Sequence, residues 1–69
     1  MLKEDFKKKL VEKEKARIVT KTGVIYYDAS KHEIEYPKGE NIQCLLKFKA
    51  TSLNDIAIPF DNIVSVEGA

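Results

Sequence analysis

The amino-acid sequence predicts a small α+β fold in which one N-terminal helix is followed by five or six short antiparallel strands. Apolar residues recur every four positions near the N-terminus, and their period then changes to two. Gly, Pro, Asp and Asn separate the apolar runs that follow. Strands this short and numerous favour a small closed β-barrel or a strongly curled sheet, because closure removes exposed strand edges. An open α+β sheet is the alternative.

Residues 2–15 are expected to form an amphipathic helix. Leu2, Phe6 and Leu10 recur every four residues, which places them in one stripe, and Val11 lies beside it. Most of the other positions are Lys and Glu, which favour helices. Since a helix of about 14 residues is marginal by itself, the stripe is expected to cover one open side of the sheet.

The β-region is expected to follow the helix with clear turn signals between its strands. Gly23 can adopt a positive φ in the first turn, and Asp28 begins the second. Pro37 and Gly39 mark a loop, and Pro59 begins the last tight turn. The β-barrel is assigned to residues 17–67, with strands at 17–20, 24–27, 32–36, 42–49, 56–58 and 63–66.

The chain of 69 residues is expected to form a single domain, because neither a repeat nor a linker divides residues 1–69. A domain of this size buries only about 60% of the surface of its unfolded chain, so oligomerisation or a partner is expected to add stability. Cys44 is the only cysteine and His32 the only histidine, so neither an internal disulfide nor a four-ligand zinc site is expected. No catalytic, cofactor-binding or metal-binding residue is assigned.

The charge is distributed unevenly along the chain. Residues 1–22 hold eight Lys and Arg against four Asp and Glu, or +4, whereas residues 23–69 hold four against seven, or −3. Such an asymmetry is typical of an interaction arm or of the solvated face of a Lys-rich helix. The only aromatic residue expected near the basic set is Phe6, which weighs against RNA binding. The candidates for nucleic-acid contact are Lys7, Lys8, Lys9, Lys15, Arg17 and Lys21.

The sequence contains no run of about 18 apolar residues, so no membrane span is expected. The charged N-terminus lacks the apolar run of a signal peptide. Together with the unpaired Cys44, these features favour the cytoplasm over an oxidising compartment.

Strand parity predicts a contact surface. The segments 24–27 and 32–36 are expected to pair as a hairpin. If Val24, Tyr26 and Ile34 face the core, the opposite side carries large apolar residues that favour contact with another chain. The predicted interface consists of Ile25, Tyr27 and Leu45, with Glu33 and Glu35 as its polar rim.

The residues that could carry chemistry have structural interpretations. Cys44 alternates with Leu46 and Phe48, so it is expected to be buried in the core rather than to act as a nucleophile. His32 follows Asp28 across a turn, where a turn-end hydrogen bond or a pH-sensitive contact is expected.

Two segments give the chain a resemblance to the Sm-like small-barrel family. Residues 23–34, a Gly-led strand with Asp28 and a polar residue four positions later, resemble the first Sm motif. Residues 56–66, where a short strand turns directly into the last strand at Asn62, are similar to the second. The resemblance implies a small barrel that forms rings and binds single-stranded RNA at the two motif turns. His32 stands where the family has Asn.

The sequence therefore predicts a non-enzymatic binding module that acts through a protein–protein interface and self-associates. An Sm-like ring that binds single-stranded RNA is the alternative. A short chain rich in Lys and Ile is also compatible with an accessory or inhibitor protein of a mobile element. No small-molecule substrate is inferred.

Overall fold

The computed structural model describes residues 1–50 and 55–68. It confirms an α+β fold, with one short helix, one 3₁₀ helix and six strands in the described part of the chain. The helix is α1 (Lys3–Leu10) and the 3₁₀ helix is η1 (Phe60–Asn62). The strands are β1 (Lys15–Thr20), β2 (Gly23–Asp28), β3 (His32–Glu35), β4 (Leu45–Ala50), β5 (Ile56–Pro59) and β6 (Ile63–Gly68).

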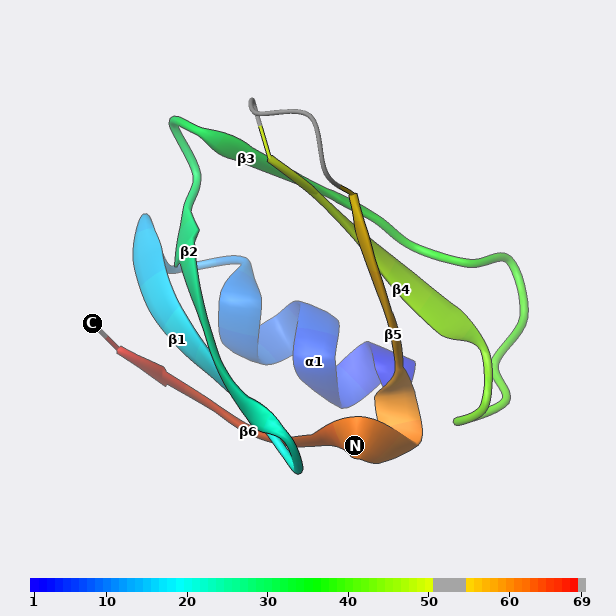
Figure 1. The fold of residues 1–69 in the computed structure, drawn as a ribbon. Coiled ribbons are helices and arrows are strands. Elements are labelled where there is room, and N and C mark those ends of the chain that lie inside the picture. The colour runs from blue at the N-terminus through cyan, green and yellow to red at the C-terminus, as the bar shows by residue number, and fades with distance from the viewer. Residues whose placement is uncertain (51–54, 69) are drawn as a thin grey trace.

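The strands form two antiparallel sheets of three strands each (Figure 1). Sheet A has the order β2-β1-β6, and sheet B has the order β3-β4-β5. The chain passes from one sheet to the other through the short turn between β2 and β3, and returns through η1 between β5 and β6. Among the described residues, no hydrogen-bonded ladder joins the two sheets into a closed barrel.

The core lies between the two sheets and α1. Phe6 of α1 makes edge-on ring contacts with Phe60 of η1, at 5.9 Å between centroids, and with Tyr36, at 6.1 Å. β2 and β3 supply only partly buried side chains to the core. The buried apolar residues are Phe6, Leu10, Ala16, Ile18, Leu46, Phe48, Ile58, Phe60, Ile63 and Val66.

The helix is shorter than the predicted segment 2–15. It ends at Leu10, because Val11 is 79% exposed and gives a further turn no contact with the core. The Lys13 amide donates to the Leu10 oxygen at 3.0 Å and turns the chain toward β1. Lys15 already pairs in sheet A, so the sheet ladder replaces the last predicted turn of the helix.

The buried stripe of the helix also differs from the prediction in its first turn. Lys3 is buried, whereas Leu2 precedes the helix and is exposed. The Lys3 Nζ donates to the Pro37 oxygen at 3.1 Å and lies 2.9 Å from a carboxylate oxygen of Glu40. A buried ammonium is tolerated here because a carbonyl and a carboxylate both satisfy it. These contacts hold the loop before β4 against α1.

Strand β4 begins later than the predicted segment 42–49. The Gln43 amide donates to the Asn41 side-chain oxygen at 2.8 Å, and the Cys44 amide donates to the Asn41 carbonyl at 3.0 Å. This local Asn turn replaces the first three residues of the predicted strand. Cys44 therefore precedes β4 and is only partly buried, and Ile42 is exposed, so the expected burial of Cys44 is wrong.

Candidate functional site

The β1–β2 hairpin determines which backbone amides and carbonyls of β2 make no hydrogen bond to β1. Thr20 pairs with Gly23, which leaves Lys21 and Thr22 as a two-residue loop. Gly23 has a φ of +156°, a conformation that L side chains rarely adopt, and this confirms the predicted role of the glycine. The Thr20 hydroxyl donates to the Gly23 oxygen at 2.8 Å. The register of the hairpin is thus specified at its turn.

Hydrogen bonds to β1 involve every second residue of β2. The Ala29 amide donates to the Glu14 oxygen at 2.8 Å, immediately beyond the last residue of β2. Bonded and non-bonded pairs alternate along an antiparallel ladder. The alternation starts from Ala29 and continues back along the observed register. The residues of β2 whose backbone groups bond to β1 are therefore Tyr27, Ile25 and Gly23.

The backbone groups of Val24, Tyr26 and Asp28 therefore face away from β1. The Asp28 amide donates in that direction, to His32 Nδ1 at 2.9 Å. No other strand of the described chain pairs with this side of β2. Val24 and Tyr26 consequently offer two amides and two carbonyls to a further strand, and we refer to these two residues as the β2 edge.

The side chains of the β2 edge are apolar and face solvent. Val24 is 46% exposed and Tyr26 is 67% exposed. The alternate residues Ile25 and Tyr27 turn inward and pack, partly buried, against the core. Exposed apolar side chains are therefore combined with free backbone groups on the same two residues.

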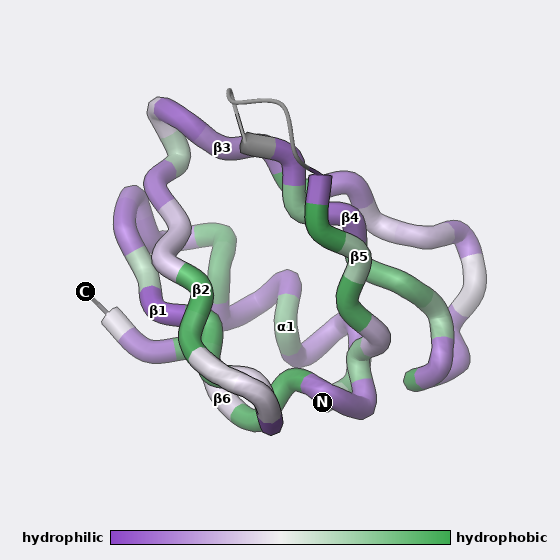
Figure 2. Tube along the Cα trace, in the orientation of Figure 1, coloured by the Kyte–Doolittle hydropathy of each residue, from purple (hydrophilic) through white to green (hydrophobic). Residues whose placement is uncertain are grey.

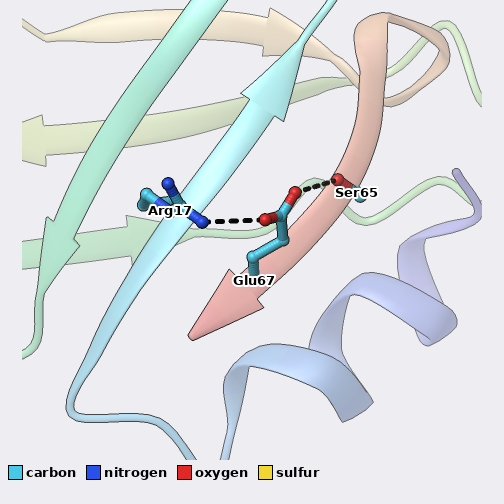
Figure 3. Close-up of polar contacts among 3 residues, drawn as sticks. All are labelled: Arg17, Ser65 and Glu67. Carbon is cyan, nitrogen blue, oxygen red and sulfur yellow. Dashed lines mark hydrogen bonds and ion pairs between the residues drawn. The ribbon is translucent and has the colours of Figure 1, made fainter. Parts of the chain in front are cut away.

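Beside the β2 edge, the outer face of sheet A carries a polar cluster of Arg17, Ser65 and Glu67 (Figure 3). Arg17 pairs with Tyr26 in the ladder, and its guanidinium donates to a Glu67 carboxylate oxygen of β6 at 2.9 Å. The Ser65 hydroxyl donates to the other carboxylate oxygen at 3.3 Å. Since both charged side chains are about half exposed, the ion pair stabilises the sheet only slightly.

A groove of about 330 Å³ opens on the inner side of β2. It lies between β2 and β5, which Figure 1 shows on either side of the front of the molecule. Ile56, on the β5 wall, is 42% exposed. On this side the β2 edge is thus bordered by exposed apolar surface of β5. The apolar lining of the groove comes from Val24, Ile25, Ile56, Ala57 and Ile58.

Of the four edge strands in the described sheets, only β2 has a run of residues, 23–27, without the features that oppose pairing with a further strand. β3 carries Glu33 and Glu35, β5 contains Pro59, and β6 joins β1 through a register shift. Charges, prolines and bulges of this kind block edge pairing. Residues 23–27 of β2 have none of them. Figure 2 shows the contrast, with β3 mostly hydrophilic and β2 hydrophobic near its hairpin turn.

The residues of the predicted interface do not form one surface. Ile25 and Tyr27 pack against the core, so their predicted outward orientation is wrong. Leu45, Glu33 and Glu35 are exposed, as predicted. The error arises from the hairpin expected between the second and third strands. β2 pairs with β1, and β3 pairs with β4 in the other sheet, so the parity of β3 does not extend to β2.

The six basic residues predicted to contact nucleic acid are all exposed. They are spread over three elements: Lys7, Lys8 and Lys9 in α1, Lys15 and Arg17 in β1, and Lys21 in the hairpin loop. Lys7 Nζ lies 5.2 Å from the ring centroid of Tyr36, a cation–π contact. The expectation that Phe6 is the only aromatic residue near the basic set is therefore wrong.

A second hollow, of about 410 Å³, lies between the end of α1 and β3. Its lining combines two lysines and one glutamate with three aromatic residues: Lys7, Lys13, Glu33, Tyr27, His32 and Tyr36. Burial raises the pKa of Tyr36 to about 12, so its hydroxyl stays protonated and uncharged at neutral pH. We refer to this site as the lysine–tyrosine hollow. No sequence pattern predicted it, because α1 and β3 meet only in the folded chain.

Asp28 and His32 close the corner between β2 and β3. The bond from the Asp28 amide to His32 Nδ1 confirms the predicted turn-end hydrogen bond. The Asp28 carboxylate accepts hydrogen bonds from the Ser30 hydroxyl at 2.7 Å and the Ser30 amide at 2.9 Å, which lower the pKa of Asp28. The His32 ring lies 4.8 Å from the Phe48 ring. The His32 side chain is therefore held by a hydrogen bond at Nδ1 and by a ring contact with Phe48.

The two turns that carry the Sm-like resemblance lie at opposite ends of β2. The Lys21 amide donates to the Asn62 oxygen at 2.9 Å beside the start of β2, whereas Asp28 is its last residue. Five steps along a strand span roughly 16 Å. One copy of the chain therefore does not gather the two turns into one site.

Comparison of the chain with protein-family models, with curated proteins and with solved structures gives no match. Among the described residues, no three potential metal ligands lie together. In the same residues, no helix has the length and apolar character needed to cross a membrane. His32 pairs with Ala50 at one end of β4 and Cys44 precedes the other end, so the thiol and the imidazole are not neighbours.

Proposed function

We propose that this chain is a non-enzymatic binding module that acts through a protein–protein interface at the β2 edge. An extended segment of another polypeptide pairs with Val24 and Tyr26 and becomes the fourth strand of sheet A. One observation carries the proposal: among the edge strands of the described chain, only β2 combines free backbone groups and exposed apolar side chains with a run, residues 23–27, that has no charge, proline or bulge.

Backbone pairing supplies a large part of the affinity in this proposal. The two amides and two carbonyls of the β2 edge allow four hydrogen bonds, each worth about 0.5–1.5 kcal/mol net. An added strand also covers the exposed side of Val24 and the groove where Ile56 is exposed. Burial of apolar surface contributes about 25 cal/mol per Å², so both faces of the added strand gain contact.

The same strand addition would close the barrel that the sequence predicts. We propose that the two sheets are the halves of a small barrel whose open side is the groove between β2 and β5. A strand added to β2 covers that groove. In this proposal the partner supplies the closure that the isolated chain lacks, which is consistent with the small core of a 69-residue domain.

A display library of extended peptides tests this function. The wild-type chain should enrich segments with apolar residues at alternate positions. Tyr26→Pro should lose these peptides, because proline removes the edge amide of residue 26 and leaves the hydrogen bonds to β1 in place. Tyr26→Ala keeps that amide and should bind the same peptides more weakly. If the folded Tyr26→Pro protein binds them as well as the wild type does, the proposal is wrong.

Binding of single-stranded RNA is the second candidate function, and the contact between Lys7 and Tyr36 favours it. Surfaces that bind single strands combine basic side chains with aromatic rings on which bases stack. The lysine–tyrosine hollow places Tyr36 and His32 beside Lys7 and Lys13. The fold thus brings together the two residue types that are separate in the sequence.

Titration with a fluorescent oligouridine tests the RNA candidate. The affinity should fall steeply as salt rises, because neutralised phosphates release counterions. The double substitution Lys7→Glu with Lys13→Glu should abolish binding. Lys47→Glu, on the exposed side of β4, is the matched control and should leave binding nearly unchanged. No binding at low salt, or binding that does not depend on salt, would exclude this candidate.

A further inference from the structure

We infer that the strand added at the β2 edge is β2 of a second copy of this chain, related to the first by a twofold axis. The inference rests on the proposed function and names the partner of that edge. Sheet A of one copy then continues into sheet A of the other through an antiparallel β2–β2 pair. A twofold interface uses the same surface twice, so that surface must be complementary to itself.

The free backbone groups of β2 are complementary to themselves in one antiparallel register. If Val24 faces Tyr26 of the second copy, then Tyr26 faces Val24 of the second copy, and Ile25 faces its own symmetry mate. Val24 and Tyr26 occupy bonded positions in this register, because their amides and carbonyls point to the free edge. The pair makes four hydrogen bonds and uses every free backbone group of both β2 edges.

The side chains also match in this register. On the outer face, Val24 lies beside Tyr26 of the second copy, and a β-branched residue next to an aromatic residue is a favourable cross-strand pair. On the inner face, Ile25 of the second copy comes over the groove where Ile56 is exposed. Residues that are only half covered in one copy are thus covered by the other.

The charges that flank the β2 edge support the same register. Thr22 of one copy comes opposite Asp28 of the other, so the exposed Lys21 lies next to that carboxylate. A shift that sets Tyr26 opposite itself places Lys21 near Lys31 of the second copy. Like charges in that position oppose pairing, whereas the Lys21–Asp28 arrangement favours it.

A disulfide across the twofold axis tests the register. In a Cys44→Ala background, which removes the only cysteine, Ile25→Cys places a thiol opposite its symmetry mate. Facing Cα atoms of a non-bonded antiparallel pair are about 4.5 Å apart, within the range of a disulfide. Mild oxidation should convert most of the chain into a covalent dimer on a non-reducing gel. Val24→Cys faces Tyr26 and should yield little dimer, and the reverse result would overturn the register.

Light scattering over a concentration series tests the association without an introduced cysteine. The wild-type mass should rise to twice that of the single chain. Tyr26→Pro removes two of the four hydrogen bonds and should weaken the dimer about thirtyfold. Leu45→Arg changes an exposed apolar residue of sheet B and is the matched control, which should leave the dimer unchanged.

Failure of this inference and failure of the proposed function give different results. A chain that stays monomeric at every concentration, yet binds displayed peptides through Tyr26, overturns the twofold pairing and leaves the β2 edge as a protein-binding site. A monomeric chain that binds no peptide overturns both. A dimer that is lost on Leu45→Arg and kept on Tyr26→Pro overturns the inference in favour of a surface on sheet B.

Discussion

Strands β2 and β3 follow each other in the chain, and each forms an edge of its own sheet, but they present opposite surfaces. β2 carries no charge before its last residue, and its outward side chains are Val24 and Tyr26. In β3 the outward side chains are Glu33 and Glu35. Both strands are edge strands, but only β2 can accept a further strand, because the glutamates of β3 oppose pairing. The side chains of an edge strand, rather than its position in the sheet, decide whether it can pair with a further strand.

The largest expected change in unfolding free energy tests which side chains of β2 face the core. The Tyr27 ring lies 6.3 Å from both the Phe48 and His32 rings, whereas Tyr26 is largely exposed. Tyr27→Ala should lower the free energy of unfolding by about 2–3 kcal/mol, because it leaves a cavity beside the core. Tyr26→Ala should change it by less than about 0.5 kcal/mol. Urea denaturation at low protein concentration measures both without a contribution from association. Equal losses would contradict the assigned faces.

The faces of β3 could be predicted from the sequence, and those of β2 could not. In β3, Glu33 and Glu35 alternate with Ile34, so the charges alone identify the outward side. In β2, Val24 through Tyr27 are four consecutive apolar or aromatic residues, and alternation gives no information. The expected orientation of these residues depends on the hairpin predicted between residues 24–27 and 32–36. The turn at 29–31 instead crosses from one sheet to the other, which reverses the inferred parity.

The remaining differences arise from contacts that are distant in the sequence. The succession of strands along the chain and the β-rich content follow from local turn signals, and the sequence predicts them almost element by element. The end of α1 depends on where β1 starts to pair, and the burial of Lys3 depends on Pro37 and Glu40. The β2 edge itself depends on the register with β1. The two-residue turn before Gly23 specifies that register, and the uncharged run 23–27 is a second local signal that a search for unprotected strands would find.

An intermediate effect is expected at the corner that joins the two strands. His32→Ala removes the acceptor of the Asp28 amide and the ring that packs against Phe48, and it should cost about 1–2 kcal/mol of unfolding free energy. His32→Asn keeps an acceptor oxygen on the side chain and should recover part of this loss. Exchange of the Asp28 amide with deuterium should be fast in the first variant and slower in the second. Equal exchange in both variants would show that the imidazole acceptor does not hold the corner.

The smallest expected effect concerns the charged edge of β3. The Glu35 carboxylate lies 2.6 Å from Lys49 Nζ of β4. A hydrogen bond from Lys49 and its positive charge, with a smaller contribution from Lys47, lower the pKa of Glu35 below its ordinary value of 4.5. A carboxyl group with a lowered pKa in the folded state stabilises the fold above its unfolded pKa. That stability is lost as the pH falls through the lowered value, and the contribution is small because both side chains are largely solvated.

Denaturation by urea as a function of pH measures this contribution. Between neutral pH and pH 3, Glu35→Gln should show a shallower loss of stability than the wild type, and added salt should reduce the difference. Asp28→Asn is the matched variant on β2, because the pKa of Asp28 is also lowered, by hydrogen bonds from Ser30 rather than by an ion pair. Its effect should therefore depend less on salt. An acid profile that Glu35→Gln leaves unchanged would mean that the charges of β3 keep further strands away without stabilising the sheet to which they belong.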